Sequence, residues 1–142
     1  FGAPVSVQAM MRYNANPNTE TADAANVNLR YPGGLVGTLN CYHVTPYIHE
    51  FRIFGTKGAL YFDTHLKKGW FQERKRNEVE YRVALDIPET SPDHDRANLV
   101  SWFEGIRSNT PVYPGLEDGI QAVLPVFAAE ISDKERREIN IS

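Results

Sequence analysis

Three histidines lie in or beside turns that this sequence predicts between its strands. His43 and His49 stand at the two ends of the segment HVTPYIH, and His65 follows Asp63 in a later turn. An imidazole exchanges protons near neutral pH, forms hydrogen bonds in both directions and binds transition metals. These side chains are therefore the first candidates for a ligand site. The alternative is that they are ordinary loop residues.

Acidic residues gather at two expected helix starts. Asp93, His94 and Asp95 begin one helix, and Glu117 and Asp118 begin the next. The first group, joined by a histidine from a strand, has the donor types of a zinc site, and the two carboxylate pairs have those of a glycosidase. Carboxylates are also favoured in the first turn of any helix by its dipole. We therefore favour a capping role and predict no metal ligand and no catalytic residue in this chain.

The sequence contains no nucleotide-binding or nucleophile motif. The glycines of Gly33-Gly34-Leu35-Val36-Gly37 do not match GxGxxG, and the patterns GxxxxGK, GxSxG and HExxH do not occur. Cys41 lies in the middle of an expected strand, where we predict a small buried side chain rather than a nucleophile. We also expect Trp102 and Phe103 to belong to a buried helix face.

Composition narrows the class of protein. The 142 residues are 42% hydrophobic and 23% charged with a net charge of −3, which is ordinary for a globular domain and gives no basic face for nucleic acid. No apolar run is long enough to cross a membrane. The single cysteine excludes an internal disulfide. A reducing compartment fits this composition, so we expect a cytoplasmic protein with no nucleic-acid or membrane partner.

The first two thirds of the sequence predict strands. Apolar and polar residues alternate from Ala22 to Tyr31, which is typical of a strand with one buried face. Gly55-Thr56-Lys57-Gly58 predicts a tight hairpin turn. The expected strands cover residues 4–13, 22–31, 35–44, 50–54, 59–62, 69–74, 79–85 and 138–141.

The last third changes to helical periodicity. Ser91 and Pro92 are typical of an N-cap and a first helical position, and they precede a stripe that includes Trp102. A second helix is predicted over Glu117–Asp133, with a kink at Pro125 and no glycine to cap its end. The apolar side of this second helix consists of Ile120, Val123, Leu124, Phe127 and Ile131.

Strands followed by helices predict an α+β fold, with a large, mostly antiparallel, open-faced sheet and helices packed on one face. The opposite sheet face then has no cover. A large exposed apolar face usually meets a partner, so we expect a homo-oligomer through the open face. The strand aromatics considered for that face are Tyr13, Tyr31, Tyr42, Phe54 and Phe62.

Short phrases spread over almost the whole chain carry a family resemblance. They are Gly2-x-Pro4-Val5-Ser6-Val7, Thr21-Ala22-Asp23, Ile53-Phe54-Gly55-Thr56-Lys57-Gly58, Trp102-Phe103-x-x-Ile106-Arg107 and Asp118-Gly119-x-x-Ala122. Together, and in this order, they resemble the C-terminal domain of the glucose–fructose oxidoreductase, inositol dehydrogenase and MocA family (Gfo/Idh/MocA).

The resemblance implies that residues 1–142 form a single C-terminal domain for substrate binding and oligomerisation. The sequence begins with Phe1 rather than Met, and we expect an upstream N-terminal Rossmann domain, absent from this chain, that binds NAD or NADP. In the family the catalytic lysine and an aspartate–histidine pair also lie upstream. This chain is therefore expected to hold no cofactor and to transfer no hydride alone.

The resemblance also implies which residues contact the substrate. The family's pocket wall includes a residue just before the strand that ends in the GTKG-like turn, which here is Tyr47. A second contact comes from the start of the long helix, here His94 or Asp95, and His43 and His49 flank the loop that contains Tyr47. Phenol and imidazole groups suit a hydroxyl-rich ligand because they donate and accept hydrogen bonds.

We therefore expect the substrate-binding and dimerisation domain of an NAD(P)-dependent oxidoreductase that acts on a sugar, a polyol or a related metabolite. Its partners would be its own Rossmann domain, a second copy and a small-molecule substrate. A non-enzymatic oligomerisation module and an independent small-ligand-binding α+β module remain alternatives.

Overall fold

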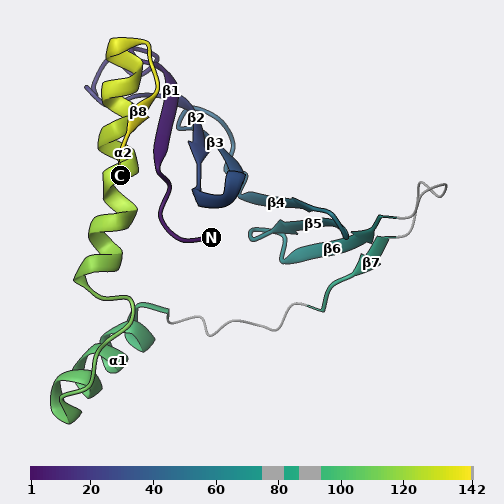
Figure 1. The fold of residues 1–142 in the computed structure, drawn as a ribbon, viewed down its shortest axis with the longest axis vertical. Coiled ribbons are helices and arrows are strands. Elements are labelled where there is room, and N and C mark those ends of the chain that lie inside the picture. Colours follow the sequence, from purple (N-terminus) through teal and green to yellow (C-terminus); the bar gives the residue numbers. More distant parts are fainter. Residues whose placement is uncertain (75–81, 87–93, 142) are drawn as a thin grey trace. The chain divides into compact units, whose positions relative to one another are not determined.

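The structure is a computed structural model that describes residues 1–74, 82–86 and 94–141. Its strands and helices confirm the predicted α+β class (Figure 1), and the strands form two antiparallel sheets of four strands each. The elements are β1 (Ser6–Arg12), β2 (Ala24–Arg30), η1 (Pro32–Gly34), β3 (Val36–Tyr42), β4 (Glu50–Gly55), β5 (Gly58–Asp63), β6 (Lys68–Glu73), β7 (Arg82–Ala84), α1 (His94–Ser108), α2 (Leu116–Glu135) and β8 (Ile139–Asn140).

Contacts divide the chain into two compact units. The first comprises Phe1–Thr45 with Leu99–Ser142, and the second comprises Pro46–Asn98. The first unit contains the sheet β3-β2-β1-β8 and helix α2, and the second contains the sheet β4-β5-β6-β7. Helix α1 begins in the second unit and continues into the first. No helix in the described ranges is long and apolar enough to span a membrane.

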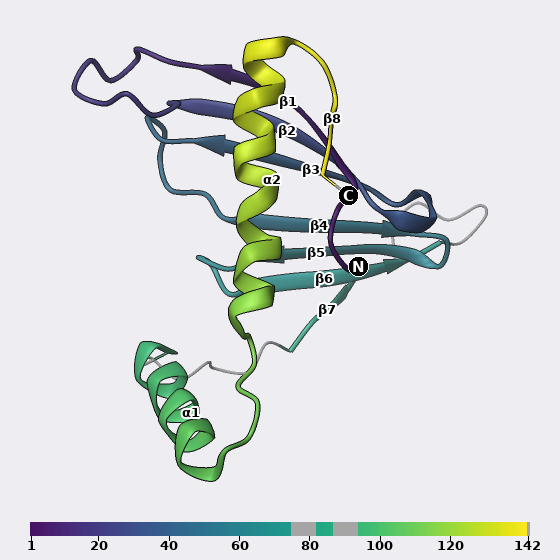
Figure 2. The same ribbon diagram turned by 60° about the vertical axis from the view of Figure 1, so that its left-hand side comes forward.

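Helix α2 lies against β1 of the first sheet (Figure 2). Val7 and Ala9 of β1 and Val27 of β2 are buried there, as the predicted alternation requires. Ala128 and Ala129 of α2 complete this core. Because the side chains of these two alanines are small, the helix axis lies close to the sheet.

The C-terminal turn of α2 also provides hydrogen-bond partners for backbone N–H groups at the edge of β1. Strand β8 pairs with β1 at two residues, and no other strand among the described residues pairs with the rest of that edge. The fully buried Ser132 accepts a hydrogen bond from the Ala9 N–H at 2.9 Å, and its hydroxyl donates to the Arg137 carbonyl at 2.6 Å. Asp133 accepts the Met11 N–H at 2.8 Å. The helix thereby closes the β1 edge.

The end of α2 agrees with the expected absence of a glycine cap. Arg136 caps the helix in the left-handed conformation, with φ 54°, and its N–H donates to the Ser132 carbonyl. Pro125 lies inside the helix, which continues on both sides of it.

The side of α2 that packs on the first sheet is not the side with the large apolar residues, which amphipathicity would predict. The apolar residues that the sequence groups on one side are between 39% and 59% exposed. The sheet-facing side carries Ala128, Ala129 and Ser132 instead.

The second sheet is built on the predicted hairpin. Gly55 pairs with Gly58 across the turn, and the register then places Glu50 opposite Asp63. A Cβ on Gly58 would lie 2.3 Å from the Gln72 carbonyl oxygen of β6, so only glycine fits there.

One face of the second sheet carries a ladder of cationic and aromatic side chains. The Arg52 guanidinium lies 5.5 Å from the Tyr61 ring centroid, Tyr61 stacks on Trp70 at 5.3 Å, and Arg82 lies 4.4 Å from the Trp70 centroid. The Tyr61 hydroxyl donates to Glu50 at 2.9 Å, and this hydrogen bond raises the pKa of Tyr61 above 10.0. The opposite face is apolar and consists of Phe51, Ile53, Leu60, Phe62, Phe71 and Val83.

Three expectations are corrected. Cys41 is exposed rather than buried, because β3 is an edge strand. Trp102 and Phe103 are 50% and 58% exposed rather than part of a buried helix face. The uncovered face of the first sheet is largely polar: the Tyr42 hydroxyl donates to Asn26 at 2.9 Å, and Asn28, Thr38 and Asn40 share that face. Residues 79–81 of one expected strand and the Ser91-Pro92 cap lie outside the described residues.

Candidate functional site

The loop that the sequence marks as a ligand site runs from the end of β3 to the start of β4. Its first residue, His43, belongs to the first unit, where its backbone N–H donates to the Asp23 carbonyl at 2.8 Å. Tyr47 and His49 belong to the second unit.

The structure brings Tyr47 and His49 together. The Tyr47 hydroxyl lies 3.4 Å from His49 Nδ1, and the two ring centroids are 6.0 Å apart. His49 Nδ1 also lies 2.8 Å from the Thr64 hydroxyl, and the His49 carbonyl accepts both the Thr64 N–H at 3.0 Å and the Thr64 hydroxyl at 3.1 Å. Thr64 therefore holds both the backbone and the ring of His49.

A third ring completes this group. His65, in the turn between β5 and β6, makes an edge contact with the Tyr47 ring at 5.5 Å between centroids. We call Tyr47, His49, Thr64 and His65 the Tyr–His cluster. Sequence reasoning noted His65 but assigned it no role. The signal was present, because the two-residue turn pairs Glu50 with Asp63, and the next pair outward is His49 and Thr64.

The chemistry of the Tyr–His cluster is hydrogen bonding. Tyr47 is 70% exposed, so its hydroxyl is accessible to a ligand. The neighbouring carboxylates are engaged elsewhere: Glu50 binds Tyr61 and Arg52, and the buried Asp63 accepts the Leu66 N–H at 2.8 Å. A phenol and imidazoles without an adjacent carboxylate suit recognition of hydroxyl groups more than proton transfer.

His43 lines a polar pocket of about 200 Å³ in the first unit. The buried Asp23 organises its wall, because its carboxylate accepts the backbone N–H groups of Ala15 and, at 3.1 Å, of Asn16. The remaining lining residues are Thr19, Thr21, Ala22 and Val44. The structure thus places His43 among hydroxyl and amide groups.

The other predicted contacts lie at the start of α1. His94 and Asp95 are the first two residues of that helix, and their side chains lie outside the described part of the structure, as does Asp93.

At the second helix start, Asp118 Oδ2 accepts the Gly115 N–H at 2.7 Å, which confirms the capping role for that acid. Within residues 1–74, 82–86 and 94–141, no three His, Cys, Asp or Glu side chains cluster closely enough to hold a metal ion.

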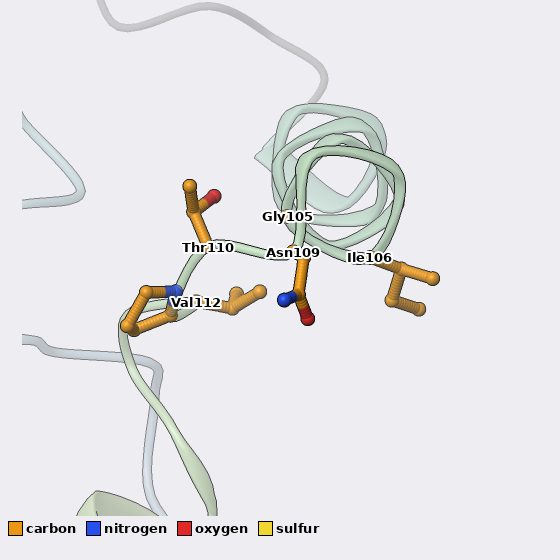
Figure 3. A pocket seen from close by; sticks show the side chains of 6 residues that line it. Gly105, Ile106, Asn109, Thr110 and Val112 are labelled. Atoms are coloured by element: carbon orange, nitrogen blue, oxygen red, sulfur yellow. The ribbon is translucent and has the colours of Figure 1, made fainter.

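A larger pocket, of about 500 Å³, lies where α1 ends. Figure 3 shows the side chains of Asn109 and Val112 pointing toward one another, while Ile106 points away from them. Gly105 allows this approach, because a Cβ there would lie 2.3 Å from the Val112 side chain. The lining, which also includes Thr110 and Pro111, has no titratable group, so this pocket offers no acid–base chemistry.

Comparison with known proteins identifies the family. Residues 1–141 match the model of the oxidoreductase family, C-terminal alpha/beta domain, of the Gfo/Idh/MocA group. The chain belongs to this family. The resemblance read from the sequence is thereby confirmed. No curated protein sequence matches the chain.

Solved structures of similar fold agree with this assignment. The aldose-aldose oxidoreductase from Caulobacter crescentus, complexed with glycerol, shares 19% identity at a TM-score of 0.81 over 98% of this chain and 42% of its own. An oxidoreductase from Agrobacterium radiobacter in complex with NAD⁺, L-tartaric acid and magnesium shares 17% at 0.76, over 98% and 44%. Levoglucosan dehydrogenase with NADH and levoglucosan shares 17% at 0.76, over 99% and 45%. At these identities the likeness shows the fold, and the chain spans less than half the length of these proteins.

Proposed function

We propose that residues 1–142 form the substrate-binding and oligomerisation domain of a longer NAD(P)-dependent oxidoreductase, which acts on a sugar, a polyol or a related hydroxylated metabolite. Membership of the oxidoreductase family supports the reaction class. The similar folds were solved with glycerol, L-tartaric acid and levoglucosan, which are all rich in oxygen, and two of them with NAD⁺ or NADH.

The observation that carries the substrate class is the geometry of the Tyr–His cluster. Thr64 binds the ring and the backbone of His49, so the imidazole is oriented before a ligand arrives. The Tyr47 ring contacts the rings of both His49 and His65, and Tyr47 is exposed. A preorganised array of hydroxyl and ring nitrogen groups recognises the hydroxyls of a polyol at low entropic cost.

Cofactor binding and hydride transfer belong, in this proposal, to an upstream Rossmann domain that binds NAD or NADP. In the same proposal this chain supplies the substrate contacts, from the Tyr–His cluster, from the pocket of His43 and from His94 and Asp95 at the start of α1. We place the parent protein in the cytoplasm, where reduction would keep the exposed Cys41 a free thiol.

Oligomerisation is proposed through the apolar face of the second sheet. Phe51, Ile53 and Val83 of this face are each about half exposed or more, and a contiguous apolar surface of this kind favours self-association. Sedimentation velocity of an Ile53→Asp variant tests this assignment, with a shift to monomer expected. An unchanged sedimentation coefficient would argue for another interface.

The test of function uses the full-length reading frame that contains this chain. Aldoses, polyols and hydroxy acids are screened for reduction of NAD⁺ and NADP⁺ by absorbance. With the best substrate, Tyr47→Phe is expected to raise KM about five- to tenfold at nearly unchanged kcat, because it removes one hydrogen bond of about 1 kcal/mol. The matched control is Tyr42→Phe, whose hydroxyl binds Asn26 on the uncovered face of the first sheet.

Two results would contradict the proposal. An absence of dinucleotide reduction with every hydroxylated substrate would remove the oxidoreductase assignment for this protein. Equal KM values for the Tyr47→Phe and Tyr42→Phe variants would remove the Tyr–His cluster from the substrate site while leaving the reaction class in place.

A further inference from the structure

The side chain of Thr64 makes two contacts with His49, and both are short enough to be hydrogen bonds. Its hydroxyl oxygen lies 2.8 Å from Nδ1 of the His49 ring and 3.1 Å from the His49 carbonyl oxygen. The Thr64 N–H donates to the same carbonyl at 3.0 Å. Every residue of the Tyr–His cluster belongs to the second unit, so these contacts form within one compact unit.

The two side-chain contacts share a single hydroxyl proton. A threonine hydroxyl donates once and accepts through its lone pairs, whereas a carbonyl oxygen only accepts. If the proton points at Nδ1, the hydroxyl and carbonyl oxygens face each other at 3.1 Å with no proton between them. If it points at the carbonyl, the hydroxyl oxygen can accept from the ring at 2.8 Å. Both contacts are therefore hydrogen bonds only when Nδ1 of His49 carries a proton.

The position of the ring proton decides what the other nitrogen of His49 offers to a ligand. In a neutral imidazole one nitrogen carries the proton and the other carries a lone pair. With the proton on Nδ1, Nε2 is a hydrogen-bond acceptor. Within the described part of the chain, the hydrogen bonds of the His49 ring all involve Nδ1. Nε2 is thus the nitrogen that remains for a ligand.

The hydroxyl of Tyr47 then has the complementary role. Its oxygen lies 3.4 Å from His49 Nδ1, and toward a protonated nitrogen it can only accept, so the phenol proton is left to donate to a ligand. A ligand hydroxyl both donates and accepts, and it can therefore bind to Nε2 and to Tyr47. An ionised carboxylate only accepts, so it can bind to Tyr47 but cannot donate to Nε2.

We propose that Thr64 is a positioning residue that fixes the ring proton of His49 on Nδ1 and thereby makes Nε2 the acceptor for a hydroxyl group of the substrate. This inference rests on the proposed function and narrows its substrate class. Neutral sugars and polyols are the substrates that fit, in preference to hydroxy acids bound through their carboxylate.

NMR of the full-length protein with isotope-labelled histidine reads the His49 tautomer without an activity assay. Spectra are recorded at alkaline pH, where the histidine side chain is neutral, and the His49 signals are those lost in a His49→Gln variant. We expect the proton on Nδ1 in the unmodified protein and in Thr64→Ser, which keeps the hydroxyl. In Thr64→Val, which keeps the side-chain shape and the backbone N–H, we expect it on Nε2, because the Tyr47 hydroxyl then becomes the donor to Nδ1.

Steady-state kinetics of the same variants tests the consequence for the substrate. Thr64→Val is expected to raise KM for the best sugar or polyol about fivefold at nearly unchanged kcat, because the hydrogen bond to Nε2 is lost. Thr64→Ser should restore KM. The matched control is Thr38→Val, since the Thr38 hydroxyl donates to Asn28 at 3.0 Å in the first sheet, and its KM should not change. In the unmodified protein, KM should be lower for a polyol than for the hydroxy acid of the same carbon number.

Three outcomes would overturn the inference. The first is a His49 proton on Nε2 in the unmodified protein, and the second is a proton that stays on Nδ1 in Thr64→Val. The third is equal KM for Thr64→Val and Thr38→Val, which would mean that the tautomer has no part in binding. The NMR and dinucleotide assays fail separately: a proton held on Nδ1 by Thr64 in a protein that reduces no dinucleotide supports the positioning role and removes the proposed reaction.

Discussion

Replacing Ser132 by alanine tests the link between α2 and β1. Ser132 is fully buried, accepts the Ala9 N–H at 2.9 Å and donates to the Arg137 carbonyl at 2.6 Å. Alanine leaves both backbone groups without a partner, and each unsatisfied group costs about 1–3 kcal/mol when buried. The gain in helix propensity offsets about 0.5 kcal/mol. We expect Ser132→Ala to lower the free energy of unfolding by about 1.5–5.5 kcal/mol.

The assay is urea unfolding followed by far-UV circular dichroism, with amide hydrogen exchange at Ala9 measured in parallel. The matched control is Ser108→Ala, because Ser108 also sits in a helix, and its hydroxyl donates to the Glu104 carbonyl at 2.6 Å in an exposed setting. Water replaces that bond, so the control should change stability by less than about 0.5 kcal/mol.

Two results would refute the reasoning about this link. One is a loss of less than about 1 kcal/mol in the Ser132→Ala variant, since that would mean that the two backbone groups find other partners. The other is unchanged exchange at Ala9, because the amide should lose its protection when its acceptor is removed. Either result would show that packing of Ala128 and Ala129, rather than the serine, holds α2 on the sheet.

Two further predictions concern the termini of α2 and β8. The hydrogen bond from Ser6, followed by that from Arg30, lowers the pKa of Glu138 below 4.5. The stability that the ionised Glu138 carboxylate gives the folded protein is therefore complete above about pH 4.5 and is lost as the pH falls through the lowered pKa. Glu138→Gln should therefore lose less stability than the unmodified protein between about pH 5 and pH 3 in acid titrations. Arg136→Gly should raise stability by about 0.5–1 kcal/mol, because glycine adopts the left-handed cap without strain. A lower midpoint of thermal unfolding would contradict it.

Much of the candidate site follows from local sequence rules. The Gly55-Thr56-Lys57-Gly58 turn sets the register of β4 and β5, and with it the position of His49 opposite Thr64. The choice of Tyr47 came from the family resemblance, and His49 was added because it flanks the same loop. The position of His65 depends on the register of β4 and β5. Extending that register beyond the pair of Glu50 and Asp63 brings the start of the next turn, where His65 lies, beside His49.

The assignment of His43 to the substrate site stays a prediction. The sequence places His43 six residues from His49, at the other end of one loop. In the structure His43 lines a pocket of the first unit, built by Asp23 and the segment before β2, and His49 belongs to the second unit. A sequence pattern does not show which side of a loop packs on which strand, because that depends on contacts between residues far apart in the chain.

In helix α2 the sequence by itself determined one property and the tertiary structure decided another. Periodicity predicted a helix over residues 117–133 with Ile120, Val123 and Phe127 on one side, and the structure has α2 over Leu116–Glu135. Only the tertiary structure decided that the small residues Ala128 and Ala129 meet the sheet. Periodicity reports which residues share a face of the helix but not which of two faces packs on the sheet. The choice between them follows from the fit of Ser132 to the open edge of β1, a hydrogen-bond pairing between residues 123 positions apart.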